Sequence, residues 1–202
     1  MISISLIIPT YLRQNIVLNT LKELGNQSVQ QFEVIVVDQS PTYNSNLSQY
    51  KYDEIEYKYI QIEEIGLPNA RNVGAKNSKG DILIFIDDDC IPDNNLVQSY
   101  ISLFSSADPD TWCFGGKVNE KNSDIFMEDA SIVGGWITWY GKTLKNFVSD
   151  ESGECEWAPG GNFAVKRSKF LEVGGFDKNF IGNAMLEDGD FGYTIRENGG
   201  KI

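Results

Sequence analysis

The sequence predicts an α/β fold, a single domain with a mostly parallel central sheet flanked by helices. The segments 32–38 (FEVIVVD) and 82–86 (ILIFI) each contain a continuous apolar run, as in strands that are covered on both faces of a parallel sheet. Strand-like and helix-like segments also alternate, with short connections, from the N-terminus to Ile86. The length agrees with this prediction, because 202 residues can bury a substantial core but are few for two domains.

Four strands and two helices are predicted in the amino-terminal part. Residues 3–9 (SISLIIP) are an apolar run that ends at a proline, and 57–62 (YKYIQI) alternate as a half-buried strand does. The apolar runs at 32–38 and 82–86 complete the four strands. Residues 14–25 have apolar side chains at helical spacing and close at a glycine. A short helix over 68–78 leads into the last strand.

The carboxyl-terminal part is less regular. Its predicted elements are strands over 111–119 and 162–166 and helices over 168–173 and 187–198, the last capped by two glycines. Between them, 132–140 (IVGGWITWY) is expected to be a loop or short helix beside the crevice. Trp136, Trp139 and Tyr140 either stack on a sugar face or fill the core, and the core is favoured slightly. The chain stops just after the last helix, so we expect it to be part of a longer protein.

The composition excludes several classes of function. A formal net charge of −12 and a pI near 4.4 argue against a nucleic-acid partner, although a bound cation would still allow a nucleotide ligand. The absence of histidine excludes Ser-His-Asp and Cys-His catalysis within this chain. Three widely spaced cysteines indicate reduced thiols and a cytoplasmic setting. Apolar runs are too short for a signal peptide or a membrane span, which leaves peripheral membrane contact open.

Polar residues follow the ends of three predicted strands. They are Pro9, Thr10 and Tyr11, then Asp38, then Asp87, Asp88 and Asp89. Because ligands bind beyond the carboxyl ends of parallel strands, we expect these residues to line one crevice. The three adjacent aspartates suit Mg²⁺ or Mn²⁺, or else form a solvated loop that caps the next helix through Asp93 or Asn94. Asp38 either contacts the ribose or base of a nucleotide or is a turn residue.

Three further places are candidates for chemistry. Arg71, early in a predicted helix, would hold a phosphate or pair with Asp87, unless it is an ordinary surface arginine. Asp188 lies in the first turn of the last helix and is a candidate general base, although the helix dipole alone favours acidic residues there. A double glycine lets the backbone approach a ligand closely, which makes Gly161 and Asn162 candidate ligand-binding residues, and a plain turn explains them as well.

Taken in order, five motifs resemble those of the family-2 glycosyltransferases, which have the nucleotide-sugar-binding fold called GT-A. The motifs are SLIIPTY (5–11), FEVIVVDQS (32–40), GLPNARNVGAKNSKGDILIFIDDD (66–89), APGGNFAVKRSKFLEVGGFD (158–177) and LEDGDFGYTIRENGG (186–200). The resemblance spans nearly the whole chain, and five ordered motifs are far more specific than any one of them. It implies one catalytic domain over 1–202, with a nucleotide-binding half of about 1–110 and an acceptor-binding half of about 111–202.

The resemblance implies that one group of residues binds the donor. Asp38 would contact the base or ribose, and Pro9, Thr10 and Tyr11 would line the same pocket. Asp87 and Asp89 would be the acids of the family's Asp-X-Asp motif, with Asp88 between them. Asp89 would ligate a divalent ion, Mn²⁺ or Mg²⁺, on the donor diphosphate, and Asp87 would help to hold the ion, the ribose or Arg71. Gly161 and Asn162 would lie on the same nucleotide-sugar site.

On the acceptor side, Asp188 would be the base that deprotonates the attacking hydroxyl. The resemblance therefore implies an inverting, metal-dependent transfer of sugar from a UDP, dTDP or GDP donor to a glycan or lipid-linked acceptor. Such a protein would work in the cytoplasm or at the inner face of the membrane. The alternative is a degenerate domain that binds nucleotide sugar or glycan without turnover.

The sequence departs from the family pattern in three places. Leu12 stands where asparagine is common, and Gln39-Ser40-Pro41 replaces the commoner Asp-Gly-Ser. Both departures lie near the expected nucleotide, so they leave the choice of base open. Many members also have a histidine metal ligand near the end of the domain, which here either lies beyond Ile202 or is missing.

Overall fold

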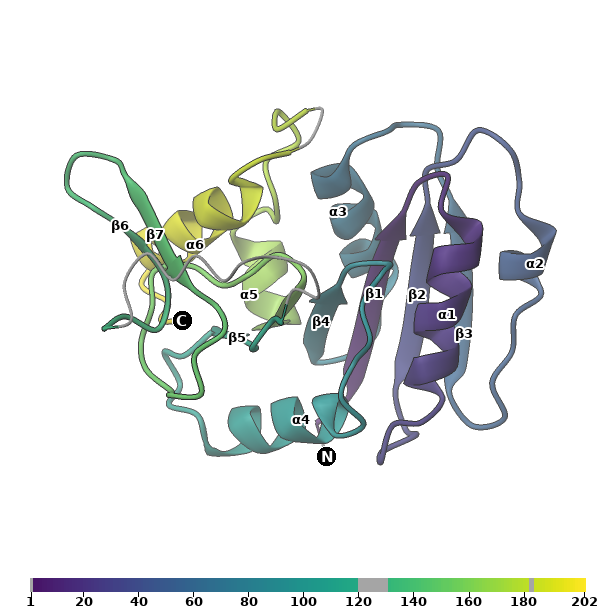
Figure 1. The fold of residues 1–202 in the computed structure, drawn as a ribbon, viewed down its shortest axis with the longest axis horizontal. Coiled ribbons are helices and arrows are strands. Elements are labelled where there is room, and N and C mark those ends of the chain that lie inside the picture. Colours follow the sequence, from purple (N-terminus) through teal and green to yellow (C-terminus); the bar gives the residue numbers. More distant parts are fainter. Residues whose placement is uncertain (1, 120–130, 182–183) are drawn as a thin grey trace.

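The computed structural model describes residues 2–119, 131–181 and 184–202 (Figure 1). Its elements are β1 (Ile4–Thr10), α1 (Gln14–Leu24), β2 (Glu33–Asp38), α2 (Ser45–Ser48), β3 (Glu56–Gln61), α3 (Leu67–Asn77), β4 (Ile82–Ile86), α4 (Leu96–Ser106), β5 (Cys113–Gly115), β6 (Gly134–Ile137), β7 (Thr143–Asn146), β8 (Asn162–Lys166), α5 (Arg167–Glu172) and α6 (Glu187–Glu197). Within the predicted acceptor-binding half, 120–130 and 182–183 lie outside the described residues.

The main sheet has six strands in the order β3-β2-β1-β4-β8-β5. The first four run parallel to one another, whereas β8 is antiparallel to β4 and to β5. Strands β6 and β7 form a separate two-stranded antiparallel sheet. The predicted α/β fold with a mostly parallel central sheet is therefore confirmed.

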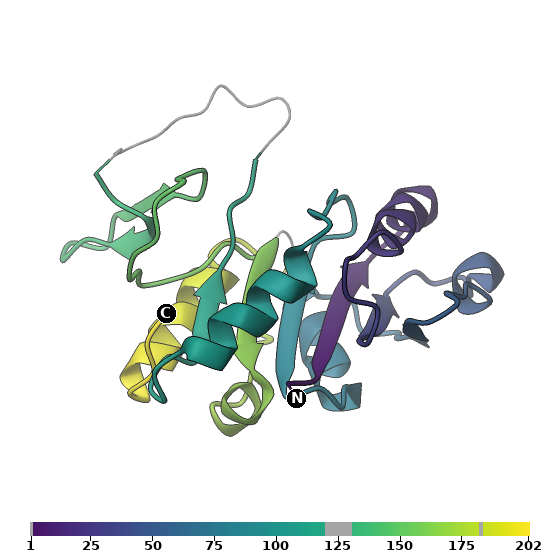
Figure 2. The ribbon, with the colours of Figure 1, turned by 90° about the horizontal axis from the view of Figure 1, so that it is seen from below.

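Helices cover both faces of the main sheet, which explains the uninterrupted apolar runs (Figures 1 and 2). Successive residues of β1 point to opposite faces. Leu6 and Ile8 belong to the core beside α1, α2 and α4, while Ile7 belongs to the core beside α3, α5 and α6. All three side chains have no exposed surface. Successive residues of such a strand can therefore all be apolar, as Leu6, Ile7 and Ile8 are.

Two predicted elements of the second half differ from the structure. Residues 132–140 were expected as a loop or short helix, but Gly134–Ile137 is strand β6 and pairs with β7. The expected strand over 111–119 is strand only over Cys113–Gly115. The predicted cap of the last helix is confirmed, because Gly199 has φ +86° and the N–H of Gly200 donates to the carbonyl of Ile195 at 3.0 Å.

Candidate functional site

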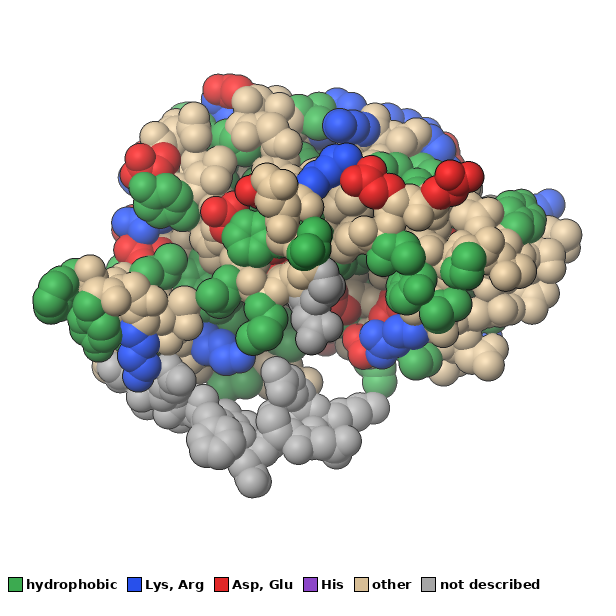
Figure 3. Space-filling view, turned by 90° about the horizontal axis from the view of Figure 1, so that it is seen from above, with side chains coloured by type: hydrophobic (Ala, Val, Ile, Leu, Met, Phe, Trp, Pro, Cys, Tyr) green, Lys and Arg blue, Asp and Glu red, His purple; other side chains and the backbone are tan. Residues whose placement is uncertain are grey.

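The carboxyl ends of β2, β1 and β4 lie side by side and bring the three groups of polar residues together. Thr10 is directly opposite Asp38 in the parallel register, and the three aspartates follow Ile86 at the end of β4. Thr10 Oγ1 donates to Asp88 Oδ2 at 2.7 Å, which joins the end of β1 to the acidic turn. The predicted convergence at one edge is confirmed. Figure 3 views the molecule from this side.

The three aspartates have different surroundings. Asp88 is 4% exposed, accepts a hydrogen bond from Thr10 and forms an ion pair with Arg13, so it is not part of a solvated loop. Asp89 is half-exposed, and its Oδ2 lies 2.6 Å from Nη2 of Arg13. Asp87 faces Arg71 instead, at 3.5 Å. The expected helix cap is also wrong by one or two residues, because the N-cap of α4 is Asn95, without a side-chain bond.

Arg13 was not singled out in the sequence, yet its guanidinium bridges Asp88 and Asp89 at 2.9 and 2.6 Å. Asp89 raises the pKa of Arg13, so the guanidinium remains charged. The positive charge beside Asp88 and Asp89 in this structure is therefore the guanidinium of Arg13. The hard oxygen donors of Asp87 and Asp89 fit Mn²⁺ or Mg²⁺, which take further ligands from water and phosphate. Among the described residues, no three His, Cys, Asp or Glu side chains form a group that could hold a metal ion.

Asp38 has both its carboxylate oxygens occupied by neighbours. Its side chain is buried, Oδ1 accepts from the N–H of Ser40 at 2.8 Å, and Oδ2 accepts from the hydroxyl of Tyr59 at 2.9 Å. Burial and this bond raise the pKa of Tyr59 to about 12, so the phenol stays a donor. The predicted turn interaction of Asp38 is therefore present. Pro9 is buried beside it, and Tyr11 is exposed.

Leu12, at the rim, holds an unfavourable backbone conformation. Its φ is +55° and its side chain is exposed, while its N–H donates to Ser40 Oγ at 2.9 Å. A left-handed conformation costs most residues about 1–2 kcal/mol, and asparagine adopts it more readily. The departure from the family's asparagine therefore has a physical consequence at this position.

The substitution Leu12→Asn is expected to raise the free energy of unfolding by about 0.5–1 kcal/mol. The melting temperature should rise by about 1–4 °C for a chain of this size. Ile16→Asn is the control, because Ile16 is also an exposed aliphatic residue but belongs to helix α1, where asparagine lowers helix propensity. Urea unfolding of both variants measures the effect, and equal destabilisation of the two would contradict it.

Arg71 is not a surface arginine. It is 1% exposed, and its Nη1 lies 2.7 Å from Glu187 Oε1, while its Nη2 donates to the carbonyl of Gly160 at 2.8 Å. The predicted pair with Asp87 exists at 3.5 Å. Arg71 thus connects α3, the acidic turn, the double glycine and α6. Glu187 was not predicted as the partner of Arg71, although it lies next to Asp188 in the sequence.

Asp188 lies across the double-glycine turn from the acidic turn. Its Oδ2 accepts from the N–H of Gly160 at 3.1 Å, and its Oδ1 accepts from the N–H of Gly189 at 2.9 Å. Burial raises the pKa of Asp188, and these two bonds oppose the rise. Leu186, the N-cap of α6 two positions before Asp188, has φ +70°, so the backbone at the start of this helix is strained.

The two residues predicted at the double glycine have different positions. A Cβ on Gly161 would lie 2.7 Å from Asp87 Oδ2, so a larger residue at this position would displace the Asp87 carboxylate. The Asn162 side chain instead accepts from the Tyr100 hydroxyl at 2.8 Å and donates to the carbonyl of Lys117 at 3.0 Å. These bonds hold it on the α4 side of β8, where it supports the strand.

The β6–β7 hairpin presents aromatic side chains to solvent. Trp139 is 94% exposed and Tyr140 is 63% exposed, so the core was the wrong expectation for both, whereas Trp136 is partly buried. Hydrogen bonds between Thr138 and Lys142 close the turn at the tip. A hydrogen-bonded turn that holds two aromatic rings in solvent is a candidate surface for a sugar chain.

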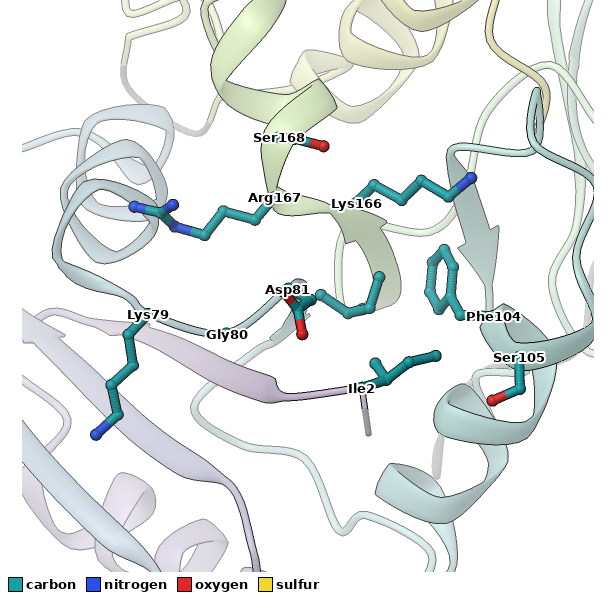
Figure 4. Close-up of a pocket in the computed structure, with 10 residues that line it drawn as sticks. Ile2, Lys79, Gly80, Asp81, Phe104, Ser105, Lys166, Arg167 and Ser168 are labelled. Carbon is teal, nitrogen blue, oxygen red and sulfur yellow. The ribbon is translucent and has the colours of Figure 1, made fainter.

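A cavity of about 760 Å³ lies at the opposite, amino-terminal end of the sheet. It is lined by Ile2, Lys79, Gly80, Asp81, Ile82, Phe104, Ser105, Lys166, Arg167 and Ser168. The cationic side chains point away from one another (Figure 4), and Lys166 and Arg167 donate to Pro109 and Ser78. This cavity therefore lacks the convergent groups of a ligand site.

Two further expectations concern the whole chain. Cys90, Cys113 and Cys155 are all free, and burial raises the pKa of the Cys90 thiol to about 11. No helix among the described residues is long and apolar enough to cross a bilayer.

Comparison with known proteins identifies the family of the chain. A family model described as "Glycosyl transferase family 2" matches residues 5–176. A validoxylamine A glucosyltransferase of Streptomyces hygroscopicus subsp. jinggangensis is 26% identical over 97% of this chain and 52% of its own length. A chondroitin synthase of Escherichia coli is 26% identical over 97% of this chain and 32% of its own length. The chain thus spans about half or less of these two curated relatives.

Solved structures with the same fold include two nucleotide-sugar complexes. A mannosyltransferase of Pyrobaculum calidifontis, in complex with GDP-Man and Mn²⁺, has a TM-score of 0.71 at 17% identity, over 98% of this chain and 53% of that one. S. aureus TarS 1-349, in complex with UDP-GlcNAc, has a TM-score of 0.72 at 18% identity, over 99% and 55% of the two chains. These likenesses confirm the GT-A fold.

Proposed function

Because the chain belongs to glycosyl transferase family 2, we propose that it transfers a sugar from a nucleotide-diphosphate donor to a hydroxyl of a glycan or lipid-linked acceptor. The observation that carries the proposal is the position of two acidic groups on either side of one glycine turn. Asp87 lies against Gly161, and Asp188 accepts from the N–H of Gly160. The fold neighbours that hold GDP-Man or UDP-GlcNAc support a nucleotide-sugar donor.

The donor binds at the carboxyl edge of the nucleotide-binding half, about 1–110. Pro9, Thr10 and Tyr11 line the pocket for the base and ribose, together with Asp38 at its floor. Both oxygens of Asp38 have partners already, so a nucleotide would share or replace the bond from Tyr59. UDP, dTDP and GDP donors all remain candidates.

Asp89 and Asp87 would hold a divalent ion, Mn²⁺ or Mg²⁺. When bound, this ion supplies positive charge for the diphosphate that leaves the sugar. Gly161 keeps the backbone close to Asp87, and Asp88 fixes the turn to β1 through Thr10. Arg71 holds the glycine turn through Gly160. These residues give the acidic turn a fixed place relative to α6.

Asp188 is the general base of an inverting transfer. The acceptor oxygen forms a bond to the anomeric carbon on the face opposite the diphosphate, and its proton passes to the Asp188 carboxylate. The bond from the anomeric carbon to the phosphate oxygen breaks, and its electron pair leaves with the diphosphate. One carboxylate is sufficient because no covalent enzyme intermediate forms.

The acceptor binds in the half formed by about 111–202. The exposed Trp139 and Tyr140 offer flat apolar faces on which sugar rings can stack. If the acceptor is lipid-linked, the protein would contact the inner face of the membrane peripherally. Both the cytoplasmic location and this contact are parts of the proposal.

A thermal-shift titration tests the donor site. UDP, GDP and dTDP are each added with and without Mn²⁺ to the wild type, Asp89→Asn and the control Asp93→Asn, whose carboxylate lies in the same loop. At about 100 times the dissociation constant, one nucleotide should raise the melting temperature by about 5–10 °C, only with Mn²⁺ and not in Asp89→Asn. No shift with any nucleotide would contradict the proposal, and a shift without sugar transfer would favour the degenerate binding domain.

A further inference from the structure

Arg13 occupies the acidic turn in the free protein although its side chain is not needed to fix that turn. Thr10 Oγ1 donates to the Asp88 side chain, and Thr20 Oγ1 donates to the carbonyls of Asp88 and Cys90 at 2.7 and 3.0 Å. These bonds connect the turn to β1 and α1 without Arg13. The guanidinium therefore neutralises negative charge on the acidic turn but does not determine the conformation of the turn.

The ion pair between Arg13 and Asp89 can be replaced by other partners at little cost in free energy. The side chains are 43% and 53% exposed, so water screens the pair. Half-exposed ion pairs contribute little net stability, because both partners are solvated well when apart. By contrast, the side chain of Asp88 is 6% exposed and retains Thr10 as a partner if Arg13 leaves.

A divalent ion on Asp89 would place two cations within a few ångströms of each other. Their repulsion favours release of the guanidinium, and a diphosphate that arrives with the ion offers it new oxygen partners. The planar fork of arginine matches phosphate oxygens with two parallel hydrogen bonds. Arg13 also belongs to the loop that leaves β1, beside the predicted nucleotide pocket.

We propose that Arg13 is a donor-binding residue that exchanges partners, pairing with Asp89 in the free protein and with the donor diphosphate when a divalent ion occupies Asp89. The exchange rests on the proposed function of this site. When the ion binds alone, it must displace the Arg13 guanidinium from Asp89. When the ion binds together with nucleotide, the displaced guanidinium forms a new bond to the diphosphate. Arg13 therefore makes the ion and the nucleotide bind cooperatively.

Calorimetric titration of the full chain tests the exchange. Mn²⁺ is titrated alone, and UDP, GDP and dTDP are then titrated at saturating Mn²⁺, into the wild type, Arg13→Gln and Arg13→Lys. Lys22→Gln is the matched control, because Lys22 lies in the last turn of α1 and its loss removes the same charge. Thermal unfolding of each variant checks that it folds.

The expected result is a pair of opposite effects. Arg13→Gln should bind Mn²⁺ alone about two- to fivefold more tightly, because no cation competes for Asp89. It should bind nucleotide about tenfold or more weakly at saturating Mn²⁺, because a charge-assisted bond is lost. Arg13→Lys should restore the weaker Mn²⁺ binding but only part of the nucleotide affinity, and Lys22→Gln should match the wild type.

Other outcomes overturn the exchange. Weaker Mn²⁺ binding by Arg13→Gln would show that Arg13 positions Asp89 for the ion, and no change in either affinity would show a simple surface pair. If the wild type and Lys22→Gln bind neither Mn²⁺ nor any nucleotide, the proposed donor site itself fails. That result differs from the others because it is independent of Arg13.

Discussion

Replacing Asp188 with asparagine is expected to slow sugar transfer by a factor of about 10²–10⁴ while nucleotide binding is retained, because only the proton acceptor is lost. Asparagine keeps the size of the side chain, and its carbonyl oxygen can still accept one of the two bonds from Gly160 and Gly189. Single-turnover transfer rates and nucleotide titrations measure the two effects separately.

The pH profile adds a second test of the same residue. Burial raises the pKa of Asp188, and the base acts only when it is deprotonated. The transfer rate should therefore fall as the pH drops through this pKa, which burial raises above the ordinary value of an aspartate. In Asp188→Asn, this acid limb should be absent from the residual activity.

The sign of the stability effect separates loss of catalysis from loss of folding. A carboxyl whose pKa is raised in the folded state binds its proton more tightly there than in the unfolded chain. Its charged form therefore lowers stability, and this cost develops as the pH rises from the unfolded pKa through the folded one. At neutral pH, Asp188→Asn should be at least as stable as the wild type.

Glu197→Gln is the matched control, because Glu197 is an exposed carboxylate at the other end of the same helix. It should leave the transfer rate and the pH profile as they are. If Asp188→Asn transfers sugar at the wild-type rate, or if both variants lose activity alike, the assignment of Asp188 as the base is wrong.

The fold was predictable because parallel strands leave a local record in the sequence. The segments 32–38 and 82–86 each contain an unbroken run of at least four apolar residues, and this pattern has few explanations other than a strand covered on both faces. Because Asp38 and Asp87–Asp89 each follow the end of a parallel strand, their position at one edge of the sheet could be predicted without knowing any side-chain contact. Strand order and polarity, not side-chain detail, carried that part of the prediction.

The partners inside the site were not predictable, because they come from distant parts of the chain. Arg13 contacts Asp89 across 76 positions, and Arg71 contacts Glu187 across 116. Arginine is seldom fully buried, so a surface position was the natural expectation for Arg71. The prediction that Trp139 fills the core was wrong for a related reason, since composition alone does not show that this side chain is exposed.

Arg71→Met is expected to lower the free energy of unfolding by about 3–5 kcal/mol, because it leaves a buried carboxylate without its cation. The melting temperature should fall by about 6–20 °C. Glu187 is 7% exposed, and burial raises its pKa while Arg71 opposes that rise. Without Arg71, the Glu187 carboxyl must either take up a proton or remain charged in a poorly solvated place. Urea unfolding near neutral pH measures the cost.

Two further variants show whether loss of the ion pair between Arg71 and Glu187 causes the lower stability of Arg71→Met. Arg196→Met breaks the pair with Glu156, in which the arginine side chain is 44% exposed, and should cost less than about 1 kcal/mol. Arg71→Met combined with Glu187→Leu removes both charges and should recover much of the lost stability. A cost for Arg71→Met no larger than that for Arg196→Met would contradict a structural role for the buried pair.

The double variant also separates stability from function. Arg71 holds the carbonyl of Gly160, whose N–H donates to Asp188, so the pair sets the distance between the acidic turn and the base. An apolar replacement can restore packing, but it cannot hold that carbonyl. Arg71→Met with Glu187→Leu should therefore unfold nearly as the wild type does, yet transfer sugar slowly. Recovery of both properties would mean that the ion pair only fills space between α3 and α6.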